Sequence, residues 1–292
     1  MEIHVGMAGL TYRTGIGLVL MMLASVASNA QTTSTTVIKS DSTAKKPVPK
    51  VIVKKPKPIH TEMSLGAKMN TNGWGAYINK GWVRSNDTKH SDQFYNLRYV
   101  ELEFNEVKNP KETKTTNQYL GSYSNESAKP YIYGKINNFY QFNLGYGFRR
   151  MIAGKPEPGS VSIHWFYLGG LSLGLLKPYY VNANVPQDNG GTGTLVRKTI
   201  KYEDDKQSFL DDRLIISSAG FTQGIGETKI VPGLHLKTGL HFDFAANKKT
   251  VLAIETGVSA DLYSSKIEIM ANQKAYPYSA NIFAAFQFGK RW

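Results

Sequence analysis

The sequence contains no cysteine among its 292 residues. This absence excludes disulfide bonds and a lipid-modified N-terminal cysteine, so an exported form of the chain would depend on packing or on a closed sheet for its stability. The apolar run at residues 16–26 is shorter than the ~20 residues that a membrane-spanning helix needs. Mean hydropathy is slightly negative, which argues against a helical membrane protein. No HExxH zinc motif is present.

The N-terminus has the pattern of an export signal. Arg13 precedes the apolar run, and the run is followed by Ser28, Asn29 and Ala30. Small residues at the first and third places before Gln31 match a signal-peptidase site. The sequence therefore predicts a signal peptide over residues 1–30, removed after Ala30.

A basic segment separates this signal from the rest of the chain, whose formal net charge is +13. A Ser/Thr run at 32–36 precedes residues 39–57, Lys39 to Lys57, where lysine and proline recur beside a single acidic residue. Such a composition forms no core, so residues 31–60 are expected to be a disordered periplasmic linker. It is either a solvated spacer or a contact for an acidic partner, lipid headgroups, the cell wall or a secretion-system protein. Nucleic acid is not an expected partner of an exported chain.

The last fourteen residues, 279–292, alternate between apolar and polar side chains. Their apolar face carries Ile282, Ala284, Phe286, Phe288 and Trp292. A period of two is typical of a strand with one apolar face. A membrane barrel has to pair its last strand with its first, since no open edge is tolerated in lipid. Phe286, Phe288 and Trp292 are therefore interpreted as a C-terminal assembly signal for the barrel-assembly machinery.

The same alternation recurs along residues 61–292 and predicts eight strands. Their expected ranges are 63–70, 74–84, 94–107, 131–150, 161–175, 231–244, 251–263 and 279–292. Asn72-Gly73 is a hairpin signal between the first two. Residues 108–130 and 179–230 are expected to be long loops, and after the third strand the connections alternate between long and short. We therefore predict an all-β chain forming a single up-and-down antiparallel transmembrane β-barrel in the outer membrane, with both termini on the periplasmic side.

The second face of these strands collects charged residues. They are Glu101, Glu103, Lys135, Arg149, His235, Lys237, His241, Asp243, Glu255 and Asp261. An interior of eight strands has room only for side chains or one small ligand, so these charges are expected to pair across the lumen. His235, His241 and Asp243 also suggest a hydrolase, but the two histidines lie roughly 20 Å apart along a strand. The sequence therefore predicts no enzyme, no metal and no cofactor.

Three segments carry a resemblance to a known group of proteins: FQFGKRW at 286–292, LSLGLLKPYY at 171–180 and VPGLHLKTGL at 231–240. The region 62–292 resembles outer-membrane barrels of Bacteroidota, of the PorT-like or OmpA-barrel-like type. The resemblance implies a non-enzymatic scaffold or adaptor in envelope assembly or protein secretion. Two other functions stay open: a narrow pore or small-ligand transporter, and a soluble lipocalin-like barrel with its aromatic face turned inward.

Overall fold

The computed structural model describes residues 59–83, 96–119, 129–154, 160–188, 193–245 and 249–292. The predicted signal peptide and nearly all of the predicted linker, including residues 39–57, lie outside this part of the chain. Among the described residues, no helix has the length and apolar character to cross a membrane.

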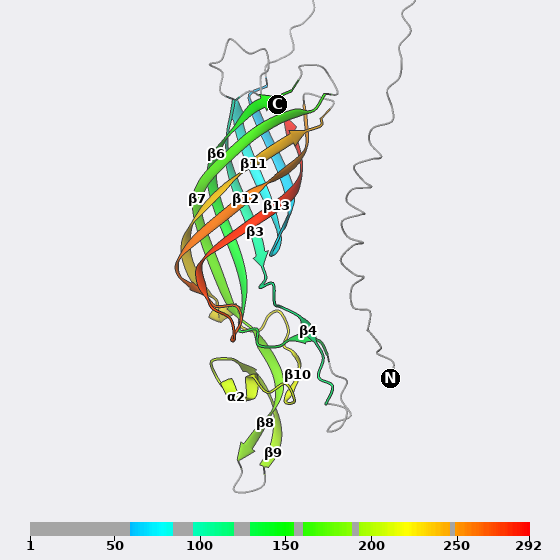
Figure 1. Ribbon diagram of the computed structural model, residues 1–292, viewed down its shortest axis with the longest axis vertical. Coiled ribbons are helices and arrows are strands. Elements are labelled where there is room, and N and C mark those ends of the chain that lie inside the picture. Colours follow the sequence, from blue (N-terminus) through cyan, green and yellow to red (C-terminus); the bar gives the residue numbers. More distant parts are fainter. Residues whose placement is uncertain (1–58, 84–95, 120–128, 155–159, 189–192, 246–248) are drawn as a thin grey trace, which may run out of the picture. The chain divides into compact units, whose positions relative to one another are not determined.

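Eight long strands form a closed antiparallel barrel (Figure 1). They are β1 (Thr61–Asn70), β2 (Gly73–Val83), β3 (Asn96–Val107), β6 (Asn137–Ala153), β7 (Ser162–Pro178), β11 (Lys229–Asp243), β12 (Thr250–Ile267) and β13 (Tyr276–Arg291). Each strand pairs with its neighbour along the chain, and β13 pairs with β1 from Glu62↔Arg291 to Asn70↔Phe283. The predicted fold class is confirmed, and so are the eight predicted strands.

The apolar face of each strand points outward. Leu236 and Leu171 are 64% and 62% exposed, and Phe288 is 61% exposed. Phe286 and Trp292 are also exposed. An apolar exterior around a polar interior is the arrangement of a barrel in lipid. A soluble lipocalin-like barrel requires the opposite arrangement, so that alternative is wrong.

Connections are sorted between the two ends of the barrel. Because adjacent strands are antiparallel, the connections at 84–95, 154–161 and 244–249 share an end with the C-terminal residue. The long connections at 108–136 and 179–228 lie at the other end, which we call the long-loop end. This sorting confirms the predicted alternation of long and short connections.

Three sequence-based expectations need correction. The predicted loop 179–230 is largely ordered: it contains β8 (Tyr180–Asp188), β9 (Gly193–Lys201), β10 (Ile215–Ser218), α2 (Lys206–Phe209) and η2 (Ile225–Glu227). Its strands form a separate sheet in the order β10-β8-β9. The first hairpin turns at Thr71 and Asn72, one residue earlier than predicted, because Gly73 already pairs with Asn70. The predicted loop 108–130 contains β4 (Lys114–Thr115), which pairs with β5 (Tyr131–Ile132).

The interior of the barrel as the candidate functional site

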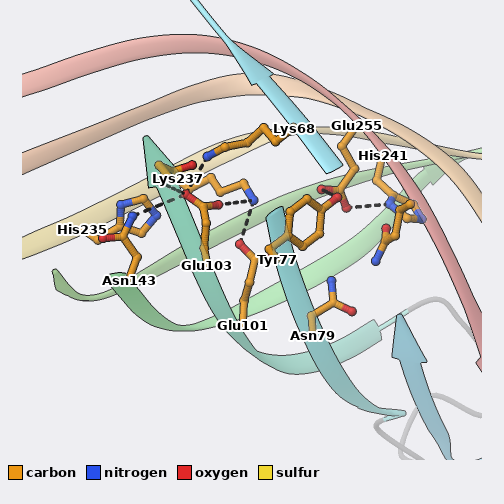
Figure 2. Close-up of polar contacts among 12 residues, drawn as sticks. Lys68, Tyr77, Asn79, Glu101, Glu103, Asn143, His235, Lys237, His241 and Glu255 are labelled. Atoms are coloured by element: carbon orange, nitrogen blue, oxygen red, sulfur yellow. Dashed lines mark hydrogen bonds and ion pairs between the residues drawn. The ribbon is translucent and has the colours of Figure 1, made fainter. Parts of the chain in front are cut away.

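Lys237 lies at the centre of one charge cluster in the barrel interior. Its ammonium group is 2.7 Å from Glu101 and 3.2 Å from Glu103. Glu103 also accepts a hydrogen bond from Lys68 at 2.6 Å, so the two lysines and two glutamates form one chain of ion pairs (Figure 2). All four side chains are at most 3% exposed. Each of these buried ions depends on its partner, because a single unpaired ion inside the barrel is strongly destabilising.

A second charge cluster lies nearer the C-terminal residue. Arg149 bridges Glu62 at 2.7 Å and Glu255 at 3.3 Å. Arg291 donates to Glu62 at 2.8 Å and also contacts Asp243. These residues come from five strands, β1, β6, β11, β12 and β13. The cluster therefore holds distant parts of the wall together across the interior.

Tyr77 connects the two clusters. Its ring centroid is 4.4 Å from the Lys237 ammonium, and its hydroxyl donates to Glu255 at 2.8 Å. The Phe283 ring lies 5.0 Å from the same ammonium. Both rings therefore add a cation–π attraction to the ion pairs of Lys237. The ring of Tyr77 fits only because Gly66 faces it: a β-carbon on Gly66 would lie 2.3 Å from the tyrosine ring.

Two layers of apolar side chains share the interior with the charge clusters and with buried polar side chains such as Gln141, Asn143 and Gln287. The middle layer consists of Tyr77, Tyr99, Phe166, Leu168, Phe283 and Ala285. The layer toward the long-loop end consists of Val107, Phe139, Leu176, Val231, Tyr263 and Ile267. An eight-stranded barrel has an interior that side chains can fill completely. The layers and the two charge clusters occupy it along its length.

The structure brings most of the charges singled out in the sequence into the two clusters, but His235 and Asp261 form a separate pair and Lys135 lies elsewhere. Glu101, Glu103 and Lys237 share the first cluster; Arg149, Asp243 and Glu255 share the second. Lys135 precedes β6 and pairs with Glu112 at 2.7 Å, so it belongs to the long-loop end and not to either cluster.

The two histidines of the hypothetical hydrolase lie in different surroundings. His235 faces Asp261 at 2.7 Å, and His241 faces Glu255 at 2.9 Å. The described residues contain no group of three or more His, Asp or Glu side chains placed to hold a metal ion.

A pentapeptide with the GxSxG spacing of hydrolases occurs at residues 170–174. It lies inside β7, whereas the hydrolase motif needs a sharp strand-to-helix turn that exposes the serine. Ser172 is fully buried and donates to Asn143 at 2.7 Å, with the Tyr263 hydroxyl 3.1 Å away. These contacts place the serine in the packing of the interior.

Several members of the two clusters were not among the interior charges predicted from the sequence. Glu62 and Lys68 share one parity with Ser64 and Gly66 on β1, and this alternation could have identified them. The inward rings had no such signal. On β2 both faces carry aromatic residues, Trp74 and Trp82 outside and Tyr77 inside, so parity alone does not separate them.

Comparisons with known proteins add little beyond the fold. No protein-family model and no curated protein matches the sequence. Among solved structures, Neisserial surface protein A is 11% identical, with a TM-score of 0.34 over 80% of this chain and 97% of that one. The attachment invasion locus protein Ail of Yersinia pestis, in complex with the heparin analogue sucrose octasulfate, is 11% identical, with a TM-score of 0.34 over 80% of this chain and 99% of that one.

A third similar structure is the N-terminal β-barrel domain of Pseudomonas aeruginosa OprF, 9% identical, with a TM-score of 0.30 over 80% of this chain and 96% of that one. Similarities this low carry no functional argument. The fold rests on the strand pairing and on the two faces of the wall. The chain is a closed eight-stranded antiparallel β-barrel of the kind that spans the outer membrane.

Proposed function

We propose that this protein is a non-conducting, non-enzymatic scaffold of the outer membrane, which holds the folded segment between β7 and β11 at the membrane surface. The filled interior carries this proposal. A scaffold needs a stable wall and no passage, and two charge clusters and two apolar layers occupy the space through which a solute would move. Roles in envelope assembly and in protein secretion remain predictions from the family resemblance.

The segment between β7 and β11 forms a hydrophobic core together with Tyr131 and Ile136 from the connection before β6, which supports a presenting role. Its buried residues include Val181, Ala183, Ile200, Phe209 and Ile215. Asp205 caps α2 by accepting a hydrogen bond from the Ser208 amide at 3.0 Å, and such capping fixes the start of a helix. With the predicted linker in the periplasm, this segment lies on the outer side of the membrane.

A narrow pore is the competing function, and conductance separates the two. We expect the full chain in planar bilayers to show no discrete conductance steps. Replacing Tyr77, Phe166 and Phe283 together by alanine removes three rings of the middle layer and should produce ion currents, since these rings occupy the interior around Lys237. Heat-modifiable gel mobility would verify that the triple variant is folded. Regular single-channel steps from the wild-type chain would contradict the scaffold proposal.

The proposed partners of the barrel are outer-membrane lipid, the barrel-assembly machinery and, through residues 39–57, an acidic periplasmic or secretion-system protein.

Trp292 offers a test of the assembly signal because its backbone and side chain have separate roles. Its backbone N–H donates to Thr61 at 3.0 Å, and its carbonyl accepts from His60 and Thr61. Its side chain is 54% exposed, so its removal leaves the barrel closure intact.

Replacing Trp292 by alanine is therefore expected to lower the outer-membrane level several-fold in cells while leaving the unfolding of the purified barrel unchanged. The matched control is Tyr276→Ala, which removes an aromatic side chain, 44% exposed, from the opposite end of β13. Quantitative immunoblots of membrane fractions measure the first effect, and urea titration measures the second. Equal membrane levels for wild type and Trp292→Ala would exclude a signal at this side chain.

A further inference from the structure

A groove of about 410 Å³ lies outside the barrel wall, next to the short sheet of β4 and β5. Its lining includes Asn117, Gln118, Tyr119, Tyr131, Tyr133 and Asp212. This volume is in the range of small-molecule sites, ~300–1,000 Å³. None of these residues takes part in the charge clusters of the barrel, so the groove is separate from the site described above.

Buried hydrogen bonds give the groove a fixed floor. The Asn117 amide donates to Ile215 at 2.7 Å and to Arg213 at 3.0 Å, and its oxygen accepts from the Tyr119 backbone at 2.8 Å. Asn117 is 6% exposed. It thereby fastens the segment after β4 to the start of β10, and the groove between them is already formed without a ligand.

Two tyrosine rings stand at the surface of this floor. Tyr119 is 51% exposed and Tyr133 is 40% exposed, although Tyr133 is held by a hydrogen bond from its hydroxyl to Leu210 at 2.8 Å. Exposed aromatic rings on a rigid support offer flat apolar faces at little cost in conformational entropy. They suit a ligand that has flat apolar faces of its own.

The polar side chains of the groove have unused hydrogen-bonding capacity. Within the described part of the chain, the Gln118 amide and the Asp212 carboxylate have no hydrogen-bond partner, and both residues are exposed. An amide supplies donors and an acceptor, and a carboxylate supplies acceptors. Asp212 is the one charged side chain among the described lining residues, and its negative charge disfavours a sulfate, phosphate or carboxylate beside it.

We propose that this groove binds a neutral oligosaccharide. The C–H faces of pyranose rings stack on Tyr119 and Tyr133, and the sugar hydroxyls meet Gln118 and Asp212. A peptide that adds a strand would find only the two-residue edges of β4 and β5 beside this groove. This inference goes beyond the scaffold role. A barrel that fails to bind sugar can still be non-conducting, and a barrel that conducts ions can still bind sugar.

The test uses the full chain in lauryldimethylamine oxide, a detergent without a sugar headgroup. Maltohexaose, cellohexaose, xylohexaose and chitohexaose are titrated by calorimetry, with a heparin-derived hexasaccharide and a Ser/Gly decapeptide for comparison. We expect at least one neutral sugar to bind and Tyr119→Ala to weaken it about tenfold, as for truncation of an aromatic anchor. Tyr119→Phe keeps the ring and should retain most of the affinity.

The matched control is Tyr278→Ala, which removes a tyrosine of similar exposure, 57%, from outside the groove. Asp212→Asn should weaken binding without altering the fold, since the Asp212 side chain supports no other described residue. Three results would overturn the proposal: no binding of any neutral hexasaccharide, tighter binding of heparin or of the peptide, or unchanged affinity in Tyr119→Ala.

Discussion

Replacing Lys237 by methionine is expected to lower the free energy of unfolding of the barrel by about 3–5 kcal/mol, the loss that follows when one partner of a buried ion pair is removed. Lys237 is 2% exposed, and Glu101 has no ion-pair partner other than Lys237 among the described residues. The carboxylate of Glu101 would remain buried without a counter-charge. Urea unfolding in lipid vesicles, followed by gel mobility and tryptophan fluorescence, measures the loss.

A double variant separates the unpaired charge from the lost packing. Glu101→Gln combined with Lys237→Met removes both charges of the pair, while Glu103 keeps Lys68 as its partner at 2.6 Å. The double variant should recover at least half of the loss. If Lys237→Met unfolds at the same urea concentration as the wild type, the cluster does not stabilise the barrel and the proposed closure of the interior loses its support.

The second large effect is expected on the outer face, at the middle of β11. Leu236 is 64% exposed on the wall. Leu236→Arg should cost about 2–4 kcal/mol, the penalty of a cation at the centre of a membrane barrel. The physical reason is desolvation, because lipid chains cannot replace the water around the guanidinium. Folding into vesicles at increasing urea concentrations gives the difference from the wild type.

Leu195→Arg is the matched control for this substitution. Leu195 lies on β9, outside the barrel, and is 53% exposed. The same chemical change at similar exposure should leave the free energy of unfolding within about 0.5 kcal/mol of the wild type, as is usual at a solvated surface. Equal destabilisation by the two variants would show that the outer face of β11 does not contact lipid.

The family resemblance predicted the architecture of the chain and no finer detail. It implied an outer-membrane barrel, and the strand pairing confirms that architecture. The alternative of a soluble barrel is wrong because it requires the apolar face of the wall to point inward, whereas side chains such as Leu171 and Ile282 point outward. The signal peptide predicted over residues 1–30 and the disordered linker predicted over residues 31–60 lie outside the described residues, apart from Ile59 and His60, and remain predictions.

The sequence by itself determined the strands, their two faces and the sorting of the connections. Each of these depends on local alternation, which is set by the geometry of an extended backbone. Parity places Phe286 on the apolar face of its strand and Glu103 on the polar face of its own, and the structure shows that the apolar faces point outward. The folding of the connection at 179–230 was hidden, because its strands pair with one another and show no long alternating run.

Only the tertiary structure decided which inward residues meet. Lys237 and Glu101 are 136 positions apart, and their contact depends on the closure of the barrel and on the register of several strand pairs. Parity places a side chain inside without fixing its height or its direction around the axis. For the same reason, only the closed barrel shows that Tyr77 and Phe283 both contact the Lys237 ammonium. It also shows that Gly66 leaves the space for the Tyr77 ring.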